Sequence, residues 1–149
     1  MSNVESIPAI SIRQPWAELI LRGKKTIEVR SWDTTYRGIL YLHTGKVPAG
    51  YKALDLGLQD VFRGGYVGTI NLASTIVFTP ELWEQWRELH LSDGPFREGL
   101  FAWMIRNPRR FKNPIPGPGA LGIFHPDPSV AEILENAPFL SSTQDENPV

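Results

Sequence analysis

Glycine and proline interrupt this chain so often that only short regular elements fit between them. The 149 residues include 13 glycines and 13 prolines. Residues 26–32 alternate between apolar and polar side chains, which is typical of a strand with one buried face. Further apolar runs occur at residues 9–12, 38–43, 66–78, 101–105 and 121–124. The sequence therefore predicts five or six strands, with glycines placed where a curved sheet bends.

Two segments carry the start signals of short helices. Pro15 stands where a helix can begin without losing a hydrogen bond, and Gly23 is a natural end for that helix. Thr79 and Pro80 open a second helix that runs to about His90. Together these elements predict the α+β class, as a small curved or closed β-barrel of about five to six strands with two to three short helices.

Residue types that are absent exclude several kinds of chemistry. The chain has no cysteine, which excludes disulfides, thiol nucleophiles and zinc sites that need sulfur. The three histidines, His43, His90 and His125, form no pair at metal-binding spacing, and we expect neither a metal nor another cofactor. The first residues lack a signal-peptide pattern, and no apolar run approaches the roughly 18 residues of a membrane span. We therefore expect a cytoplasmic protein with no membrane partner.

Charge is distributed unevenly along the chain, although the net charge is only −1. Residues 13–52 carry a net +5 and residues 97–112 a net +4, whereas residues 53–96 carry a net −4. If folding brings the two basic segments together, the protein has a positive face that suits an anionic partner. The alternative is that both segments are ordinary solvated surface.

A single domain accounts for most of the chain, because 149 residues is the usual size of one folding unit. We expect this domain to span residues 1–126. Residues 127–149 contain five acidic and no basic side chains, and the last nine residues show no periodicity. This segment is predicted to be a flexible acidic tail.

The densest polar chemistry lies between Gly23 and Arg30, where the first helix ends and a strand begins. Lys25 stands at this junction, and Glu28 and Arg30 share one face of the strand. A glutamate flanked by cations stays ionised and can accept a hydrogen bond from the amino group of a nucleobase. A partly buried lysine beside another cation can instead act as a base or nucleophile. The remaining alternative is an ion pair that only braces the strand.

Aromatic and hydrogen-bonding side chains surround this cluster in the sequence. Aromatic rings interleaved with cations are suited to stack on unpaired bases and to hold phosphates. Trp16 also lies on the apolar face of the first helix, so burial in the core is its alternative role. The basic pair near residue 110 either contacts phosphate or forms a solvated strand edge. The candidate binding residues, besides Lys25, Glu28 and Arg30, are Arg13, Gln14, Trp16, Trp32, Tyr36, Arg37, Arg109 and Arg110.

These residues belong to a longer motif. Gln-Pro-Trp at residues 14–16 is followed by Gly-x-Lys-x-x-Glu-x-Arg at residues 23–30. This combination resembles the ASCH domain family, which belongs to the PUA-like superfamily of small β-barrels, and it is most similar to the transcription-coactivator-like branch. The resemblance implies a cleft, lined by the hallmark residues, that binds RNA, single-stranded DNA, or a single nucleoside or unstacked nucleotide.

The resemblance also implies an alternative in which the protein is a hydrolase. Small relatives include an amidohydrolase that deacetylates N4-acetylcytidine and a reported ribonuclease. Lys25 matches the lysine of the amidohydrolase, whereas Glu28 stands where that enzyme has threonine, as is characteristic of the coactivator-like branch. In this alternative Lys25 and Glu28 are the catalytic residues. The amidohydrolase also uses a later glutamate, which would fall near residues 84–88, but no motif assigns it here, so that set of three residues is not carried over. A third possibility, a protein-interaction module, leaves the hallmark residues without a role.

Overall fold

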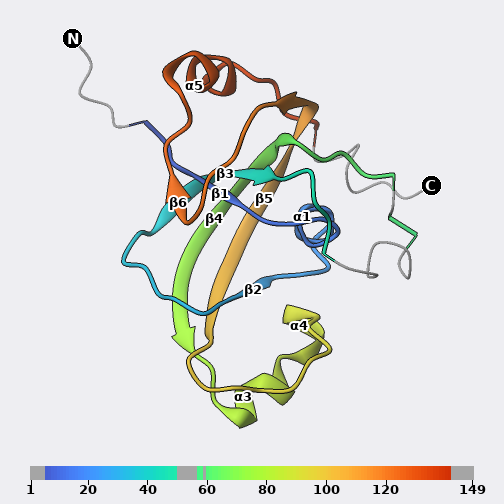
Figure 1. Ribbon diagram of the computed structural model, residues 1–149, viewed down its shortest axis with the longest axis vertical. Helices are drawn as coiled ribbons and strands as arrows, with labels where there is room; N and C mark the ends of the chain where they lie inside the picture. Colours follow the sequence, from blue (N-terminus) through green and yellow to red (C-terminus); the bar gives the residue numbers. More distant parts are fainter. Residues whose placement is uncertain (1–5, 50–56, 59, 142–149) are drawn as a thin grey trace.

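The computed structural model describes residues 6–49, 57–58 and 60–141, and within them six strands form one curled sheet (Figure 1). The strands lie in the order β2-β5-β4-β3-β1-β6, with β1 parallel to β3 and the other neighbours antiparallel. Their bounds are β1 (Ala9–Ser11), β2 (Ile27–Arg30), β3 (Gly38–Thr44), β4 (Gly65–Val77), β5 (Phe101–Pro116) and β6 (Ile123–Phe124). This curled half-barrel confirms the predicted α+β, barrel-like fold.

Two long strands, β4 and β5, give the sheet its curvature. A Cβ on Gly68 would lie 2.0 Å from the carbonyl oxygen of Arg109, and a Cβ on Gly65 would lie 2.3 Å from that of Ile115. The strands approach this closely because neither glycine has a side chain. The register of the pair also shifts at three places, and such bulges bend a strand and increase its twist.

Short helices pack around the sheet. They are α1 (Trp16–Leu21), α3 (Pro80–Gln85), α4 (Arg87–His90) and α5 (Pro128–Glu135). The hydroxyl oxygen of Thr79 caps α3 by accepting a hydrogen bond from the backbone N–H of Leu82 at 3.1 Å. The single helix predicted from Thr79 to His90 is instead divided at Trp86, whose backbone leaves the helical region, and α4 packs against β2. In the part of the chain that the structure describes, no helix is long and apolar enough to cross a bilayer.

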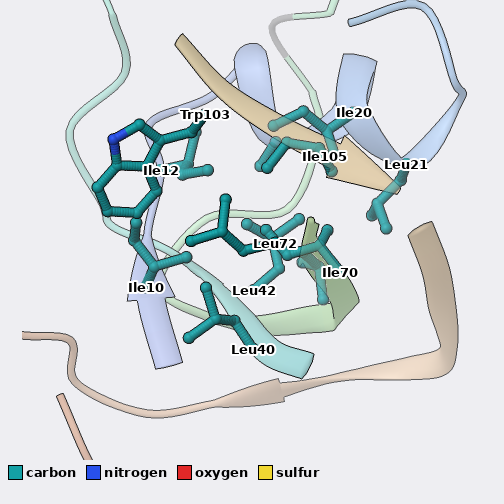
Figure 2. Close-up of a cluster of buried hydrophobic side chains, with 12 residues drawn as sticks. Ile10, Ile12, Ile20, Leu21, Leu40, Leu42, Ile70, Leu72, Trp103 and Ile105 are labelled. Carbon is teal, nitrogen blue, oxygen red and sulfur yellow. The ribbon is translucent and has the colours of Figure 1, made fainter. Parts of the chain in front are cut away.

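The main hydrophobic core lies between α1 and one face of the sheet (Figure 2). Buried side chains from β1, α1, β3, β4 and β5 meet there, and full burial of each stabilises the fold by about 1.5–3 kcal/mol. Trp103 on β5 is the largest of them, and its indole N–H donates a hydrogen bond to the carbonyl of Trp32 at 3.2 Å. This contact ties the loop after β2 to the core. The other labelled members are Ile10, Ile12, Ile20, Leu21, Leu40, Leu42, Ile70, Leu72 and Ile105.

The segment after residue 127 differs from the flexible acidic tail that its charge pattern predicts. Its described part, up to residue 141, forms α5 and then returns to β5, where Phe139 stacks on Phe111 with ring centroids 5.2 Å apart. Leu134 of α5 is buried in a second apolar cluster with Tyr41 and Tyr66. The physical reason is that these apolar side chains bury against the sheet while the acidic ones stay in solvent. Residues 142–149 lie outside the described residues.

Candidate functional site

A cleft of about 710 Å³ opens beside β2, and five separate stretches of the chain form its wall. These stretches are the end of β1 with the start of α1, β2 with the residues after it, Trp83 of α3, the segment between α4 and β5, and the loop before β6. Among the described residues, the charged side chains on the wall are Arg13, Glu28, Arg30 and Arg97. Three cations against one carboxylate make the cleft suited to an anionic ligand.

β2 places the hallmark residues at this wall because it is an edge strand, paired only with β5 in the sheet order. Glu28 and Arg30 lie on the same strand face, as the alternation predicts. Arg30 Nε donates to Glu28 Oε2 at 3.1 Å, and Arg30 Nη2 forms an ion pair with the same oxygen at 3.0 Å. Arg30 Nη2 also donates to the carbonyl oxygen of Ser11 at 2.9 Å. The guanidinium is therefore held in one position between β2 and β1.

Lys25 lies behind the cleft wall, and it is only 4% exposed. Its ammonium donates to the carbonyl oxygen of His90 at 2.5 Å, lies 3.6 Å from Glu28 Oε1, and sits 5.1 Å from the ring centroid of Trp16. Burial lowers the pKa of Lys25 and the charge of Arg30 lowers it further, while the carboxylate of Glu28 acts in the opposite direction. Lys25 thus orients Glu28 and supports Trp16 from inside the fold.

Three tryptophans line the cleft, and one of them, Trp83, is buried. Trp16 and Trp32 are only partly buried, and both pack against the main core. Trp32 meets Trp103 edge to face, with ring centroids 4.8 Å apart. Trp16 therefore packs on the core, as its place on the apolar helix face predicts, and also lines the cleft, while its stacking on a base stays a prediction. Rings anchored in this way are pre-positioned to stack on a flat ligand.

Three of the candidate binding residues are instead used to hold the backbone. Gln14 is 1% exposed, donates to the carbonyl of Phe62 at 2.9 Å and accepts from the N–H of Glu18 at 2.9 Å. The hydroxyl of Tyr36 donates to the carbonyl of Ile39. Arg37 donates to carbonyl oxygens of its own loop and to the hydroxyl of Thr75. Gln14, Tyr36 and Arg37 are not among the residues that line the cleft, and their contact with nucleic acid stays a prediction.

The arginines of the second basic segment, residues 97–112, lie in different parts of the structure. Arg110 donates to both carboxylate oxygens of Glu18 at 3.0 and 2.9 Å, which joins β5 to α1. The guanidinium of Arg109 lies 3.8 Å from the ring centroid of Phe139. Neither arginine lines the cleft, whereas Arg97, at the start of the same segment, does.

The cleft also contains residues for which the sequence offers no local signal. Arg97 and the loop at residues 120–122 come from regions about 70 to 90 positions away from β2 along the chain. The uneven charge count was the one available indication for Arg97. Among residues 6–49, 57–58 and 60–141, no group of three or more histidine, aspartate or glutamate side chains is arranged to hold a metal ion.

A curled sheet with a Glu–Arg pair on its edge strand and a buried lysine just before that strand defines a class of small α+β domains of the PUA-like type. A family model for the ASCH domain matches residues 10–115, so the chain belongs to the ASCH domain family. The predicted resemblance is therefore confirmed.

Similarity to individual proteins agrees with this membership. The chain is 46% identical over 55 residues to Activating signal cointegrator 1 of Mus musculus and 44% identical over 55 residues to that of Homo sapiens. Each match covers 36% of this chain and 9% of the longer protein. This similarity agrees with the predicted coactivator-like branch.

Solved structures extend the similarity in fold to most of the chain. The ASCH protein from Zymomonas mobilis has a TM-score of 0.61 and 16% sequence identity, over 89% of this chain and 96% of that one. A tyrosine-to-phenylalanine variant of the same protein matches over 99% of its chain with a TM-score of 0.60. At this identity the likeness shows a shared fold.

Proposed function

We propose that the cleft binds single-stranded nucleic acid by holding one unstacked nucleotide. The observation that carries this proposal is the combination, among the described residues of one wall, of two partly exposed tryptophans, three arginines and a single carboxylate. Unpaired bases are recognised by stacking on aromatic rings together with hydrogen bonds to their edges, and the backbone is held by cations. A volume of about 710 Å³ is large enough for one nucleotide.

Each part of the wall has a role in this proposal. Trp16 and Trp32 stack on the base, since both line the cleft and are supported from behind by the core. Glu28 accepts a hydrogen bond from the base through Oε1, because its other oxygen is occupied by Arg30. Arg13 and Arg97, which are both exposed, contact phosphates.

The position of Lys25 favours binding over the hydrolase alternative in which this lysine attacks a substrate. Lys25 is not among the residues that line the cleft, and its ammonium already donates to the carbonyl of His90. Its neighbours Glu28 and Trp16, at 3.6 and 5.1 Å from the ammonium, line the cleft instead. A lysine held in this way orients a carboxylate and is poorly placed to reach a bound nucleoside.

Binding of fluorescently labelled oligouridine and oligodeoxyuridine, measured by anisotropy at several salt concentrations, tests the proposal. Each phosphate contact on a single strand contributes about −0.7 to the slope of log K against log salt. We expect the Arg13→Gln/Arg97→Gln double variant to flatten that slope by about 1.4. Arg106→Gln is the matched control, because Arg106 is an exposed arginine of β5 that does not line the cleft.

Trp32→Leu tests the stacking component separately. Loss of one base–aromatic stack weakens binding by about 1–3 kcal/mol, and this loss should persist at high salt. Absence of any binding at about 50 mM salt, where phosphate contacts are strongest, would contradict the proposal. If the Arg13→Gln/Arg97→Gln double variant and Arg106→Gln lose equal affinity for the oligonucleotides, the binding surface does not coincide with the cleft.

A further inference from the structure

A serine at the wall of the cleft is hydrogen-bonded to a buried histidine behind it. Ser11 and His43 are direct partners in the parallel pairing of β1 with β3, and Ser11 Oγ lies 2.9 Å from His43 Nδ1. The other ring nitrogen, Nε2, lies 2.9 Å from the carbonyl oxygen of Gly117. The ring therefore bridges the serine and the loop that follows β5.

These partners determine which nitrogen carries the proton. A carbonyl oxygen only accepts hydrogen bonds, so Nε2 of His43 must be the protonated nitrogen that donates to Gly117. In a neutral ring Nδ1 then has a free electron pair, which accepts the hydroxyl proton of Ser11. A serine nucleophile and its general base are paired in this way, although here the two ring nitrogens are exchanged relative to the Ser-His-Asp triad and a backbone carbonyl takes the place of the orienting carboxylate.

The surroundings of His43 keep the ring neutral and fixed. It is 2% exposed and lies edge-on to the rings of Tyr66 and Phe124, with centroids 4.9 and 6.1 Å away. Burial lowers the pKa of His43, and the hydrogen bond to Gly117 offsets only part of that effect. A Cβ on Gly119 would come within 2.4 Å of the ring, so this loop closes tightly over it.

Ser11 itself lines the cleft, and Arg30 donates to its carbonyl oxygen at 2.9 Å. A fixed positive charge beside the serine can stabilise the negative charge that develops on an attacked carbonyl oxygen. The chain contains a second pair, Ser6 and His125, whose Oγ and Nδ1 are 3.0 Å apart. That pair is exposed and neither residue lines this cleft, which makes it a natural control.

We propose that Ser11 and His43 form a catalytic pair that hydrolyses a carboxylic ester carried by an anion of nucleotide size. The choice of a nucleotide-like anion rests on the proposed function of the cleft, whereas the reactivity of the pair does not. Ser11 Oγ bonds to the ester carbon and passes its proton to His43 Nδ1. The carbon–oxygen bond to the alcohol breaks as Nδ1 returns that proton to the leaving oxygen.

Water completes the reaction. It attacks the acylated serine, gives a proton to His43 Nδ1, and Ser11 leaves with that proton, which releases the carboxylic acid. The net change is ester plus water to acid plus alcohol, and it needs no other reactant. The hydroxyl of Ser11 and the ring of His43 return to their starting states.

Two probes test the reactivity of the pair without assuming the natural ligand. Diisopropyl fluorophosphate should label Ser11 with a diisopropyl phosphoryl group, as located by tandem mass spectrometry, and p-nitrophenyl acetate should be hydrolysed. Ser11→Ala should lower hydrolysis at least about 100-fold, which is the lower end of general-base catalysis. His43→Gln, which keeps a polar side chain on β3, should abolish the labelling of Ser11, while Ser6→Ala changes neither readout.

The results separate this inference from the binding proposal. Hydrolysis that depends on Ser11 would support the catalytic pair. If that hydrolysis shows no preference for acetylated AMP over acetylated adenosine, the substrate is not required to be an anion, which contradicts that part of the proposal. Nucleotide binding without labelling of Ser11, or with label on Ser31 or Ser92 instead, overturns the pair and leaves the binding proposal intact. Unchanged hydrolysis in a folded Ser11→Ala variant, checked by circular dichroism, also overturns it.

Discussion

Two glutamates, Glu18 and Glu28, are each about 8% exposed and each lie against two cations, but their hydrogen bonding differs. Both oxygens of Glu18 accept bonds from Arg110, at 3.0 and 2.9 Å, and Arg22 Nε adds a third at 2.7 Å. Around Glu28, Arg30 bonds to Oε2, while Oε1 lies 3.6 Å from the Lys25 ammonium, beyond hydrogen-bond distance. Glu18 is absent from the cleft wall and Glu28 is part of it.

The carboxylate of Glu18 is therefore used to stabilise the fold, whereas the carboxylate of Glu28 can still accept a hydrogen bond from a ligand. The bonds to Glu18 join α1 to β5, and charge-assisted bonds of this kind are about twice as strong as neutral ones. A carboxylate offers about four acceptor positions, so Glu28 keeps capacity on the oxygen nearer Lys25. The same local chemistry therefore has a structural use at one end of α1 and a candidate binding use at β2.

The largest expected effect follows from exchanging each carboxylate for an amide. Glu18→Gln leaves one acceptor oxygen where two are in use and points an NH₂ group at a guanidinium, so we expect a loss of about 2–3 kcal/mol in the free energy of unfolding. Glu28→Gln keeps an oxygen for Arg30, and we expect a loss of about 1 kcal/mol. Urea unfolding of both variants measures this, and equal losses would remove the distinction between the two sites.

The stability that Glu18 contributes should decrease as the pH falls. Burial alone would raise the pKa of Glu18, but hydrogen bonds and charge from Arg110 and Arg22 outweigh it and hold the pKa below its ordinary value of 4.5. A lowered folded-state pKa contributes stability that is present above 4.5 and is lost as the pH falls through the folded value. The stability gap between the wild type and Glu18→Gln should therefore narrow from pH 7 to pH 3. A constant gap in urea midpoints over that range would contradict this account.

Removing the charge of Arg110 tests the same comparison through the cation that bonds to Glu18. Because it bonds to both oxygens of Glu18 and does not line the cleft, Arg110→Gln should cost about 1–2 kcal/mol of stability. Its affinity for oligouridine, measured by anisotropy, should stay within about twofold of the wild type. A marked loss of affinity with unchanged stability would return Arg110 to the binding surface predicted from the sequence.

Arg22 should show the smallest effect. Its side chain is 48% exposed and meets Glu18 four residues along the same helix, where solvent screens the pair. Arg22→Gln is expected to cost about 0.3–0.5 kcal/mol in urea unfolding. A loss as large as that of Arg110→Gln would mean that helix α1 itself depends on this pair.

The sequence predicted the candidate site where its residues are neighbours along the chain. Glu28 and Arg30 are two residues apart on one strand, so the period of the strand alone places them side by side. Gln14 could not be assigned in this way, because its partner Phe62 lies 48 residues away. Arg97 and Ser11 join the cleft only through the packing of distant segments, and no spacing rule relates them.

Local patterns in the sequence thus determined the curled α+β sheet, the starts of the short helices α1 and α3, family membership and the hallmark residues at β2. These features depend on backbone periodicity and on the conformational limits of glycine and proline, which act over a few residues. The tertiary structure decided which of two equally buried glutamates lines a cleft and which arginines bond to other parts of the fold. It also decided that Ser11 lies beside His43. Those outcomes depend on strand order and on hydrogen-bond partners that are many residues apart in the sequence. A buried polar side chain bonds to the partner that packing places beside it, and local spacing does not determine that partner.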